Sequence, residues 1–396
     1  MSAIPAIHFS VLVVGAGPVG LATALTLARR GVAVQVLEKR PALSEASRAS
    51  TFHPPTLDLL HALGVLREVE PQGRRIDEIH YYRCEAGEVT LVARFRLGVL
   101  AGETGHPYRL HLEQSRLTPV LLRELARHPG CGVRFGAALL AAVDNGDHAE
   151  VSIRSGDGIE RLRAAWLVGA DGANSRVREA AGIAFEGEDY EKRVLRVMTP
   201  LDLRCVIPQL AGIAYLQHGA DSISLLAMPG VWRVIIRLPA AIGDEQALDP
   251  TFIQPLLRDF LPLKADLPIA STDIYRVSQR IAARYRSGRV LLAGDSAHVT
   301  NTRGGMNMNC GLHDAHVLGH ALADAVQGND PALERYAASR RAIAADALIP
   351  RTDSAVSTGP GRLDELAAVA ADPPRALEFL RAAAMLDIAP PMKVST

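Results

Sequence analysis

Short apolar runs separated by glycine-rich turns dominate the start of the chain. Residues 11–14 and 32–37 are rich in valine and leucine, which is typical of strands buried on both faces of a parallel sheet. Residues 19–30 between them have the pattern of a helix, and Gly31 stands where a helix C-cap belongs. The pattern therefore predicts a strand–helix–strand unit.

The rest of the chain alternates between two patterns. Further buried strands are expected at 166–170 and 289–293, and helices at 56–63, 115–128, 252–260 and 310–326. The runs 151–154 and 159–163 flank Ser155-Gly156-Asp157-Gly158, which predicts a hairpin. Other strand-like runs lie at 79–83, 89–95, 196–203, 213–218, 222–227 and 231–238. The middle third therefore predicts a largely antiparallel sheet, separate from the parallel one.

Composition narrows the possible functions. The 396 residues carry 43 Lys and Arg against 43 Asp and Glu, and a net charge of zero argues against a nucleic-acid or anionic-membrane binder. Residues 10–28 are uncharged, but no Lys or Arg precedes them, and glycines and a proline interrupt them. We therefore expect no membrane insertion and a cytoplasmic protein. The four cysteines form no Cys-x-x-Cys pair and give no zinc pattern.

A glycine motif joins the first strand to the first helix. In this motif Gly15 permits a tight turn, Gly17 lets a pyrophosphate approach the backbone, and Gly20 lets the helix pack closely on the strand. Glu38, at the end of the second strand, is placed to accept hydrogen bonds from ribose hydroxyls, and an acid there disfavours the 2′-phosphate of NADP. The context predicts a dinucleotide site that contains Gly15, Gly17, Val19, Gly20, Glu38 and Lys39.

Two distant segments extend this site. Residues 167–178, with Asp171-Gly172, and residues 293–298, with Gly294-Asp295, resemble the D-G and G-D motifs of the class A flavoprotein monooxygenases. These are the para-hydroxybenzoate hydroxylase-like, FAD-dependent aromatic hydroxylases. The three motifs occur in the family's order, and the resemblance covers residues 9–345. It implies FAD as the cofactor, with further contacts from Arg48, Gln114, Asp171, Gly172 and Asp295.

Residues 303–309 run into the helix predicted at 310–326. Two adjacent glycines and a helix N-terminus suit an electron-rich group such as the flavin N1–C2 carbonyl, which predicts that Gly305, Met308 and Asn309 contact the cofactor.

The same segment departs from the family pattern of two prolines and a later Gln-Gly pair. The prolines are replaced by Asn301 and Thr302, and the Gln-Gly pair by Met306 and Asn307. A proline carbonyl helps to stabilise the flavin hydroperoxide in the family, so the change bears on oxygen activation.

The resemblance implies an α/β fold. A Rossmann-like FAD-binding domain with a parallel sheet is expected at 1–75, 97–180 and 281–350. An interleaved substrate domain with a largely antiparallel sheet is expected at 76–96 and 181–280, and a C-terminal helical segment at 351–396.

The resemblance also implies a reaction. NADH or NADPH reduces FAD, dioxygen forms a flavin C4a-hydroperoxide, and one oxygen atom hydroxylates an electron-rich aromatic or heteroaromatic small molecule. No second Gly-x-Gly-x-x-Gly occurs, which argues against a two-Rossmann reductase. Two alternatives stay open: a flavoprotein of the same fold that performs epoxidation, N-hydroxylation or reduction, and a non-enzymatic dinucleotide-binding protein. The expected partners are a small aromatic substrate, O2 and NAD(P)H, with the chain as a monomer or homodimer.

In this scheme the flavin carries the chemistry, and protein side chains orient or activate the ring. The candidates, drawn from the antiparallel layer and its approaches, are His53, Tyr81, Tyr82, Tyr215 and His218.

Three histidines on the last core helix are candidate metal ligands. His313, His316 and His320 recur at helical spacing, but the one acid that could complete a set with them, Asp314, points elsewhere, so we expect no metal.

Overall fold

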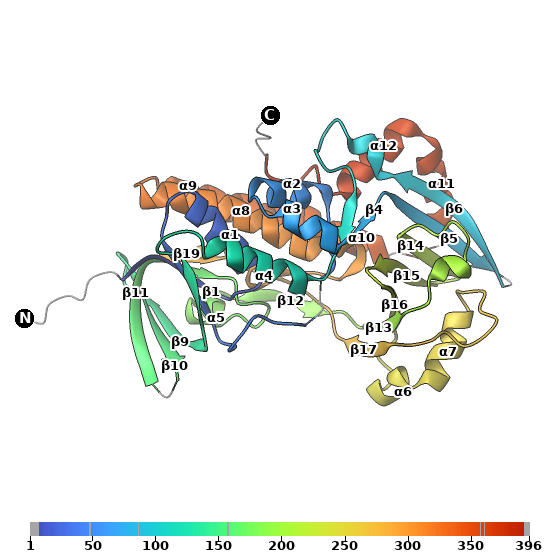
Figure 1. The fold of residues 1–396 in the computed structure, drawn as a ribbon, viewed down its shortest axis with the longest axis horizontal. Helices are drawn as coiled ribbons and strands as arrows, with labels where there is room; N and C mark the ends of the chain where they lie inside the picture. Colours follow the sequence, from blue (N-terminus) through green and yellow to red (C-terminus); the bar gives the residue numbers. More distant parts are fainter. Residues whose placement is uncertain are drawn as a thin grey trace, which may run out of the picture.

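The computed structural model describes residues 8–46, 49–85, 87–156, 158–356, 358, 359 and 361–391. Two large sheets stand at opposite ends of an elongated molecule, and long helices run along one side of it (Figure 1). The predicted α/β fold, with one parallel and one largely antiparallel sheet, is confirmed.

Five parallel strands form the centre of the first sheet, in the order β20, β11, β1, β2, β8. Their bounds are β1 Phe9–Val14, β2 Val34–Glu38, β8 Gly132–Phe135, β11 Gly158–Gly169 and β20 Val290–Leu292. Three antiparallel strands extend the sheet: β9 Ala137–Asp144, β10 Ala149–Ser155 and β19 Arg286–Ser287.

Strand β11 differs from the prediction of two separate strands at 159–163 and 166–170. Its first half pairs antiparallel with β10, and its second half pairs parallel with β1. The two alanines between the predicted strands keep an extended backbone, because neighbours on both sides supply hydrogen bonds there.

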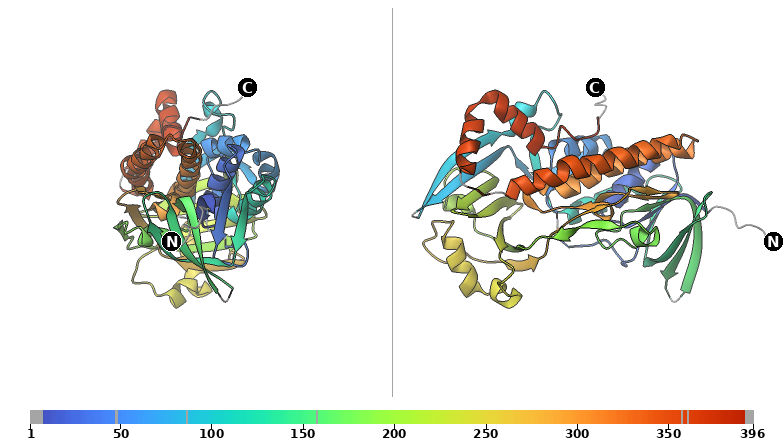
Figure 2. Two further views of the ribbon diagram at one scale, coloured as in Figure 1. Left: turned by 90° about the vertical axis from the view of Figure 1, so that its left-hand side faces the viewer. Right: turned by 180° about the vertical axis from the view of Figure 1, so that it is seen from behind.

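Helices cover the parallel sheet closely. Helix α1 (Pro18–Arg29) packs against α8 (Met306–Val326), where a Cβ at Gly319 would come within 2.6 Å of the Cβ of Thr26. Helix α4 (Gln114–Leu125) packs on α1, and α9 (Pro331–Ile343) lies beside α8 (Figure 2). The shorter helices near this sheet are α2 Pro54–Ala62, α3 Leu66–Val69 and α5 Arg176–Ala180.

The second sheet has seven strands in the order β17, β13, β16, β15, β14, β5, β6. Their bounds are β5 Glu78–Glu85, β6 Glu88–Arg96, β13 Arg193–Thr199, β14 Ile213–His218, β15 Asp221–Met228, β16 Val231–Leu238 and β17 Ser271–Tyr275. All neighbours are antiparallel except β14 and β5. Four helices pack near it: α6 Asp244–Leu248, α7 Pro250–Arg258, α11 Arg362–Ala371 and α12 Pro373–Ala383.

Two three-stranded sheets and short helical segments make the connections. One small sheet contains β3 Thr51–Phe52, β7 Arg109–His111 and β4 Arg74–Ile76; the other contains β12 Phe185–Asp189, β18 Ser278–Ala282 and β21 His298–Val299. After α9 the chain makes a π-helical turn, Ala344–Leu348, and continues as α10, Ile349–Val356.

The chain alternates between two hydrophobic cores. The first core draws residues from 11–69, 108–183 and 282–344, and the second from 76–100, 195–267 and 363–384. Leu97 and Leu100, which the predicted division gives to the FAD-binding domain, lie in the second core. Leu363 and Leu380 of the C-terminal helices lie there too. The exact domain boundaries stay a prediction.

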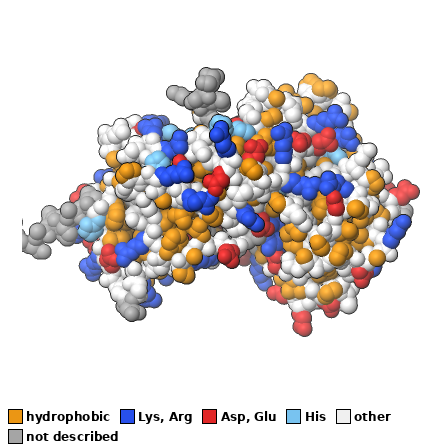
Figure 3. Space-filling view, viewed as in Figure 1, with side chains coloured by type: hydrophobic (Ala, Val, Ile, Leu, Met, Phe, Trp, Pro, Cys, Tyr) orange, Lys and Arg blue, Asp and Glu red, His pale blue; other side chains and the backbone are white. Residues whose placement is uncertain are grey.

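Two features of the structure concern the expectations that the chain binds no nucleic acid and does not insert into a membrane. Basic and acidic side chains are interspersed on the face shown in Figure 3. Across the described residues, no helix combines the length and apolarity needed to cross a membrane.

Packing of the C-terminal helices can be tested with Leu366, which is buried in α11 against the antiparallel sheet. Leu366→Ala removes a buried side chain and leaves a cavity, so the free energy of unfolding should fall by about 2–4 kcal/mol in a urea titration. Glu365→Ala, one position away on the exposed side, is the matched control. Equal free energies of unfolding for the two variants would contradict the packing of α11 against the antiparallel sheet.

Candidate functional site

The glycine turn at the carboxyl end of β1 has the geometry predicted for it. Gly15 has φ +108°, and a Cβ there would lie 2.3 Å from the carbonyl oxygen of Ala170. A Cβ at Gly20 would lie 1.9 Å from the carbonyl oxygen of Gly15. Gly17 differs, because nothing lies within 4 Å of the position of a Cβ and its backbone lines a cavity. The turn is therefore tight on its protein side and open toward a ligand.

Glu38 closes this turn from the second strand. Its two carboxylate oxygens accept hydrogen bonds from the backbone N–H groups of Ala16 (2.9 Å) and Arg40 (3.0 Å), and the residue is buried. Glu38 does not line the cavity, and the neighbouring Lys39 is exposed. Contacts of these two side chains with a ribose stay a prediction.

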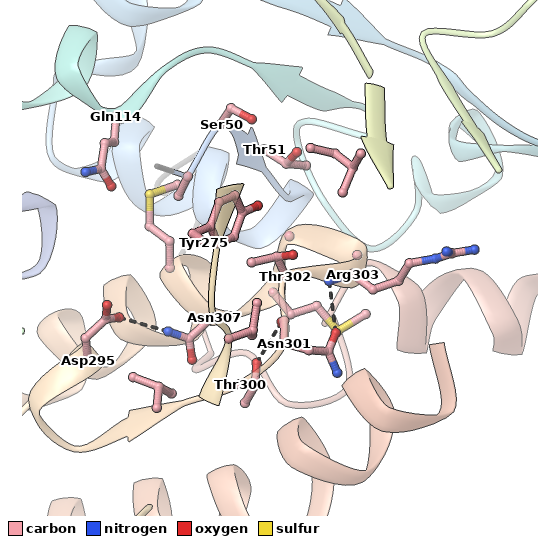
Figure 4. A pocket seen from close by; sticks show the side chains of 18 of the residues that line it. Ser50, Thr51, Gln114, Tyr275, Asp295, Thr300, Asn301, Thr302, Arg303 and Asn307 are labelled. Atoms are coloured by element: carbon pink, nitrogen blue, oxygen red, sulfur yellow. Dashed lines mark hydrogen bonds between the residues drawn. The ribbon is translucent and has the colours of Figure 1, made fainter. Parts of the chain in front are cut away.

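A cavity of about 840 Å³ extends from this turn to the face of the antiparallel sheet. Gly17, Pro18 and Val19 line it on one side, and Ile213, Tyr215 and Ile235 line it on the other. Its size is that of a site for a sizeable organic ligand. Figure 4 shows side chains from both parts of the molecule projecting into it, with Asp295 and Arg303 on opposite sides of the view.

The G-D segment forms the cavity wall next to the turn. Asp295 lines the cavity and accepts a hydrogen bond from the Asn307 side-chain amide (2.8 Å), seen as a dashed line in Figure 4. The side-chain oxygen of Asn307 lies 3.0 Å from Nδ1 of His298. Asn307, one of the departures from the family pattern, therefore connects Asp295 to the buried interior.

The loop before α8 is ordered by side chains rather than by prolines. Asn301 accepts a hydrogen bond from the backbone N–H of Arg303 (2.9 Å), and Asn309 donates to the carbonyl oxygens of Thr51 (2.8 Å) and Gly305 (2.6 Å). Gly305 (φ +66°) and Met308 line the cavity, whereas the fully buried Asn309 lies behind the loop. A direct cofactor contact by Asn309 stays a prediction.

The D-G segment contributes its backbone to the cavity. Asp171 accepts hydrogen bonds from the Ser175 hydroxyl (2.5 Å) and the Arg176 N–H (2.7 Å), so its carboxylate caps α5. Burial raises the pKa of Asp171, and these hydrogen bonds oppose the rise. Gly172 lines the cavity, and so does Gln114 at the start of α4. Arg48 lies outside the described residues.

Only one of the five ring-contacting candidates from the sequence lines the cavity. Tyr215 lies on its sheet side. Tyr82 points into the second core, where its hydroxyl lies 3.1 Å from Nδ1 of His80, and His218 is exposed at the end of β14. The fold gives no support to substrate contacts by Tyr82 or His218. Tyr81 contacts Tyr215 with ring centroids 5.1 Å apart and the ring planes tilted by 34°.

His53 lies behind the glycine loop. Its Nε2 is 2.8 Å from the carbonyl oxygen of Gly304, which it can reach as a donor, and the ring is completely buried. Burial, reinforced by the charge of Arg109, lowers the pKa of His53 well below its usual value. His53 is therefore neutral and fixes the loop instead of lining the cavity.

Sequence reasoning missed the polar groups on the sheet side. Tyr275 projects into the cavity (Figure 4) from β17, a short strand that was not predicted. Arg233 and Arg237 both line the cavity from β16. Their spacing of four residues in a predicted strand is a sequence signal that both side chains share one face.

A buried charged cluster lies beneath the G-D segment. Ligand-type atoms of His298, Cys310 and Asp314 lie within 4.8 Å of one another, the one such group found among the described residues. Arg340 donates to Asp314 (2.6 Å) and lies 3.2 Å from the sulfur of Cys310. A permanent positive charge there disfavours a metal cation, so we interpret the cluster as an ion-pair network.

The protonation states fit that interpretation. Burial alone would raise the pKa of Asp314, but Arg340 and His298 hold it well below its usual value. Burial opposes protonation of His298, yet Cys310 and Asp314 raise its pKa well above its usual value. The carboxylate therefore stays ionised between two cations.

The three helix histidines do not converge. His313 lies 3.1 Å from the Thr56 hydroxyl, whereas His316 and His320 contact each other with ring centroids 4.6 Å apart. Burial lowers the pKa of His313 to about 3 and that of His316 to about 4.

An α/β fold with this turn and cavity defines a dinucleotide-binding protein, and comparisons with known proteins make the class specific. A family model described as "FAD binding domain" matches residues 8–349. The para-nitrophenol 4-monooxygenase of Pseudomonas sp. (strain WBC-3) is 31% identical over 350 residues, which cover 84% of this chain and 83% of that protein. The chain therefore belongs to this FAD-binding family, among the flavin-dependent monooxygenases of aromatic compounds.

Solved structures agree. The p-nitrophenol 4-monooxygenase PnpA from Pseudomonas putida DLL-E4 has a TM-score of 0.88 at 28% identity, over 96% of this chain and 98% of that one. A ternary complex of aklavinone-11 hydroxylase with FAD and aklavinone has a TM-score of 0.77 at 29% identity, over 91% and 73%. The resemblance inferred from the three motifs is confirmed.

The residues present fit FAD. The open space at Gly17 would admit a pyrophosphate at the N-terminus of α1, and the Asp295 carboxylate, which lines the same cavity, would accept hydrogen bonds from hydroxyls of the cofactor. The loop from Gly305 to Met308 lines the cavity where a flavin ring would be expected.

Asp295→Ala tests this assignment. Loss of a charged hydrogen-bond acceptor should weaken FAD binding by about 10- to 100-fold in a fluorescence titration of apoprotein. Asp273→Asn is the matched control, since Asp273 also lines the cavity but on the sheet side. An unchanged FAD affinity in Asp295→Ala would refute the role.

Asp314→Asn tests the buried network. It leaves Arg340 and His298 without their carboxylate, so the free energy of unfolding should fall by about 3–5 kcal/mol. Asp364→Asn breaks an exposed pair with Arg83 and should leave the urea midpoint nearly unchanged. Equal midpoints for the two variants would show that the network does not hold the fold together.

Proposed function

We propose that this chain uses NADH or NADPH and dioxygen to hydroxylate a small, electron-rich aromatic or heteroaromatic molecule. The observation that carries the proposal is the single cavity that joins the glycine turn and Asp295 to the face of the antiparallel sheet. A cofactor held at the turn would have its reactive end beside the space under the sheet. Bound FAD supplies the redox chemistry that activates dioxygen and delivers one oxygen atom.

The protein's own contribution is to hold and orient a flat ring. Ile213, Leu226 and Ile235 give the sheet side of the cavity an apolar surface, which suits an aromatic substrate and excludes water from it. Tyr215 and Tyr275 add hydroxyls at defined positions on the same side. Burial raises the pKa of Tyr275, so this hydroxyl stays protonated and can donate a hydrogen bond to a ring oxygen.

The relatives support this substrate class. Their printed names include para-nitrophenol, pentachlorophenol and 6-hydroxy-3-succinoylpyridine monooxygenases. All three names describe a hydroxylated ring, either phenolic or heteroaromatic. The proposal carries that shared chemistry, and not any one of those substrates, to this chain.

An isotope experiment tests the reaction. FAD-loaded protein is mixed with NADH or NADPH and a panel of phenols and hydroxypyridines under ¹⁸O₂, and products are analysed by mass spectrometry. We expect one labelled oxygen atom per product and substrate-dependent consumption of the reductant. Label found only in hydrogen peroxide would contradict hydroxylation, and an epoxide or N-hydroxylated product would favour the alternative chemistry.

Tyr215→Phe tests the substrate side. Loss of one hydrogen bond to the substrate should lower kcat/KM by about tenfold while FAD affinity stays unchanged. Tyr82→Phe, on the neighbouring strand but facing the second core, is the matched control and should leave kcat/KM unchanged. If kcat/KM fell in Tyr82→Phe and not in Tyr215→Phe, Tyr82 and not Tyr215 would be the residue that contacts the substrate.

A further inference from the structure

A series of hydrogen bonds leads from the protein interior to the cofactor side of the cavity. A carboxylate oxygen of Asp314 lies 2.8 Å from Nε2 of His298, and Nδ1 of the same ring lies 3.0 Å from the side-chain oxygen of Asn307. The Asn307 amide then donates to Asp295 (2.8 Å), and Figure 4 shows this last link as a dashed line. Asp314 and His298 are completely buried, whereas Asn307 and Asp295 line the cavity. These four side chains, the polar chain, connect a buried ion pair with the cavity surface.

The direction of each hydrogen bond in the polar chain follows from the carboxylates at its two ends. A carboxylate only accepts, so Nε2 of His298 donates to Asp314, and the Asn307 NH2 group donates to Asp295. The side-chain oxygen of Asn307 therefore faces His298 and accepts from Nδ1. An imidazole ring that donates from both nitrogens is protonated on both, so His298 is a cation. Burial opposes this charge, yet Cys310 and Asp314 raise the pKa of His298 well above its usual value, which agrees with the geometry.

The positive charge of His298 is shared with a second cation around one carboxylate. Asp314 pairs with His298 at 2.8 Å and with Arg340 at 2.6 Å, so a single carboxylate faces two cations. Because neither the ring nor the carboxylate reaches solvent, water screens these charges less than it would at the surface. The polar chain directs their effect toward the cavity, since the polarised amide of Asn307 ends at the cavity wall.

Asn307 is the residue that makes this connection possible. It stands in the first turn of α8, at a position where the family pattern has glycine, and a glycine could form neither of its side-chain hydrogen bonds. The same turn and the residue before it line the cavity through Gly305, Met306 and Met308. A flavin ring bound at this loop would therefore be influenced by the charge of His298, which is held behind the loop.

We propose that the polar chain raises the reduction potential of bound FAD, with His298 as the source of positive charge and Asn307 as the positioning residue that links it to Asp295. Addition of a hydride places two electrons and one proton on the flavin, so the ring gains one negative charge. A positive charge fixed near the ring therefore favours the reduced form over the oxidised form. The proposal requires FAD in the cavity, and it does not depend on which aromatic ring is hydroxylated.

The midpoint potential of the bound flavin tests the proposal without substrate or turnover. FAD-loaded protein is reduced gradually without oxygen beside a dye of known potential, and the spectra of flavin and dye are compared. Asn307→Ala removes the link between His298 and Asp295. We expect a potential lower by about 30 mV, which corresponds to a tenfold smaller preference for reduced over oxidised FAD in a two-electron couple. The affinity for oxidised FAD should fall less than in Asp295→Ala, because the carboxylate remains.

Two further variants separate the effect of charge from that of shape. Asn307→Asp keeps the size of the side chain but adds an anion at the cavity wall, so the potential should fall below that of Asn307→Ala. His298→Gln keeps a polar side chain and removes the positive charge, so the potential should fall as it does in Asn307→Ala. Asn329→Ala, at an exposed position after α8, is the matched control and should leave the potential unchanged. A role limited to packing would weaken the binding of both redox forms equally and would not move the potential.

An unchanged potential in Asn307→Ala would overturn the proposal, whatever happens to the affinity for FAD. A higher potential in Asn307→Asp than in Asn307→Ala would contradict the direction of the charge effect. If His298→Gln does not fold, because Asp314 loses a buried partner, the two Asn307 variants still decide, since Asn307 lies at the cavity surface. None of these measurements uses dioxygen or an aromatic substrate, so failure of the proposal is distinguishable from failure of hydroxylation in the ¹⁸O experiment.

Discussion

One buried carboxylate, Asp314, holds together the elements that shape the cofactor side of the cavity. It lies on α8 and pairs with Arg340 of α9 (2.6 Å) and with His298 of the segment after β20 (2.8 Å). Separating a buried charge from its partners is unfavourable by several kcal/mol, so these three elements are fixed relative to one another. Asn307 extends the constraint, because it joins His298 to Asp295 at the cavity surface. The position of Asp295 in the cavity wall is therefore fixed by hydrogen bonds that lead to the buried Asp314.

A second constraint is the close approach of backbones around the glycine turn. The backbone of Gly15 lies so close to Ala170, just after β11, that a side chain at Gly15 would clash. Gly20 likewise lets the first turn of α1 pack directly against the backbone of Gly15. The alternation of the chain between two cores then sets the antiparallel sheet opposite this turn, and the cavity lies where the two parts meet. The regions proposed for the cofactor and the substrate are consequently one space, which suits a reaction in which a reduced cofactor must act directly on a bound ring.

The sequence predicts the parts of this structure that depend on local pattern. The first strand, its glycine turn and its helix follow from apolar periodicity and from the requirements of a dinucleotide, and the resemblance adds Asp295. Long-range packing decides the rest. Tyr81 and Tyr82 are adjacent in a strand, so their side chains point to opposite faces of the sheet. Only the register of β5 with β14 shows that Tyr81 is the one beside Tyr215. Strand β9 is rich in alanine and was missed, because its pairing with β10 outweighs its weak propensity.

The two sides of the cavity differ in their polar groups. One side of the cavity is lined by the N-terminus of α1 and the Asp295 carboxylate, and the other by apolar side chains of the antiparallel sheet together with Tyr215 and Tyr275. A crystal structure of the FAD-loaded protein with a phenol that it hydroxylates tests this arrangement most directly. We expect the pyrophosphate at Gly17, the flavin ring beside Gly305 and Met308, and the substrate between that ring and Tyr215. A flavin bound outside the cavity, or a substrate bound away from the antiparallel sheet, would contradict it.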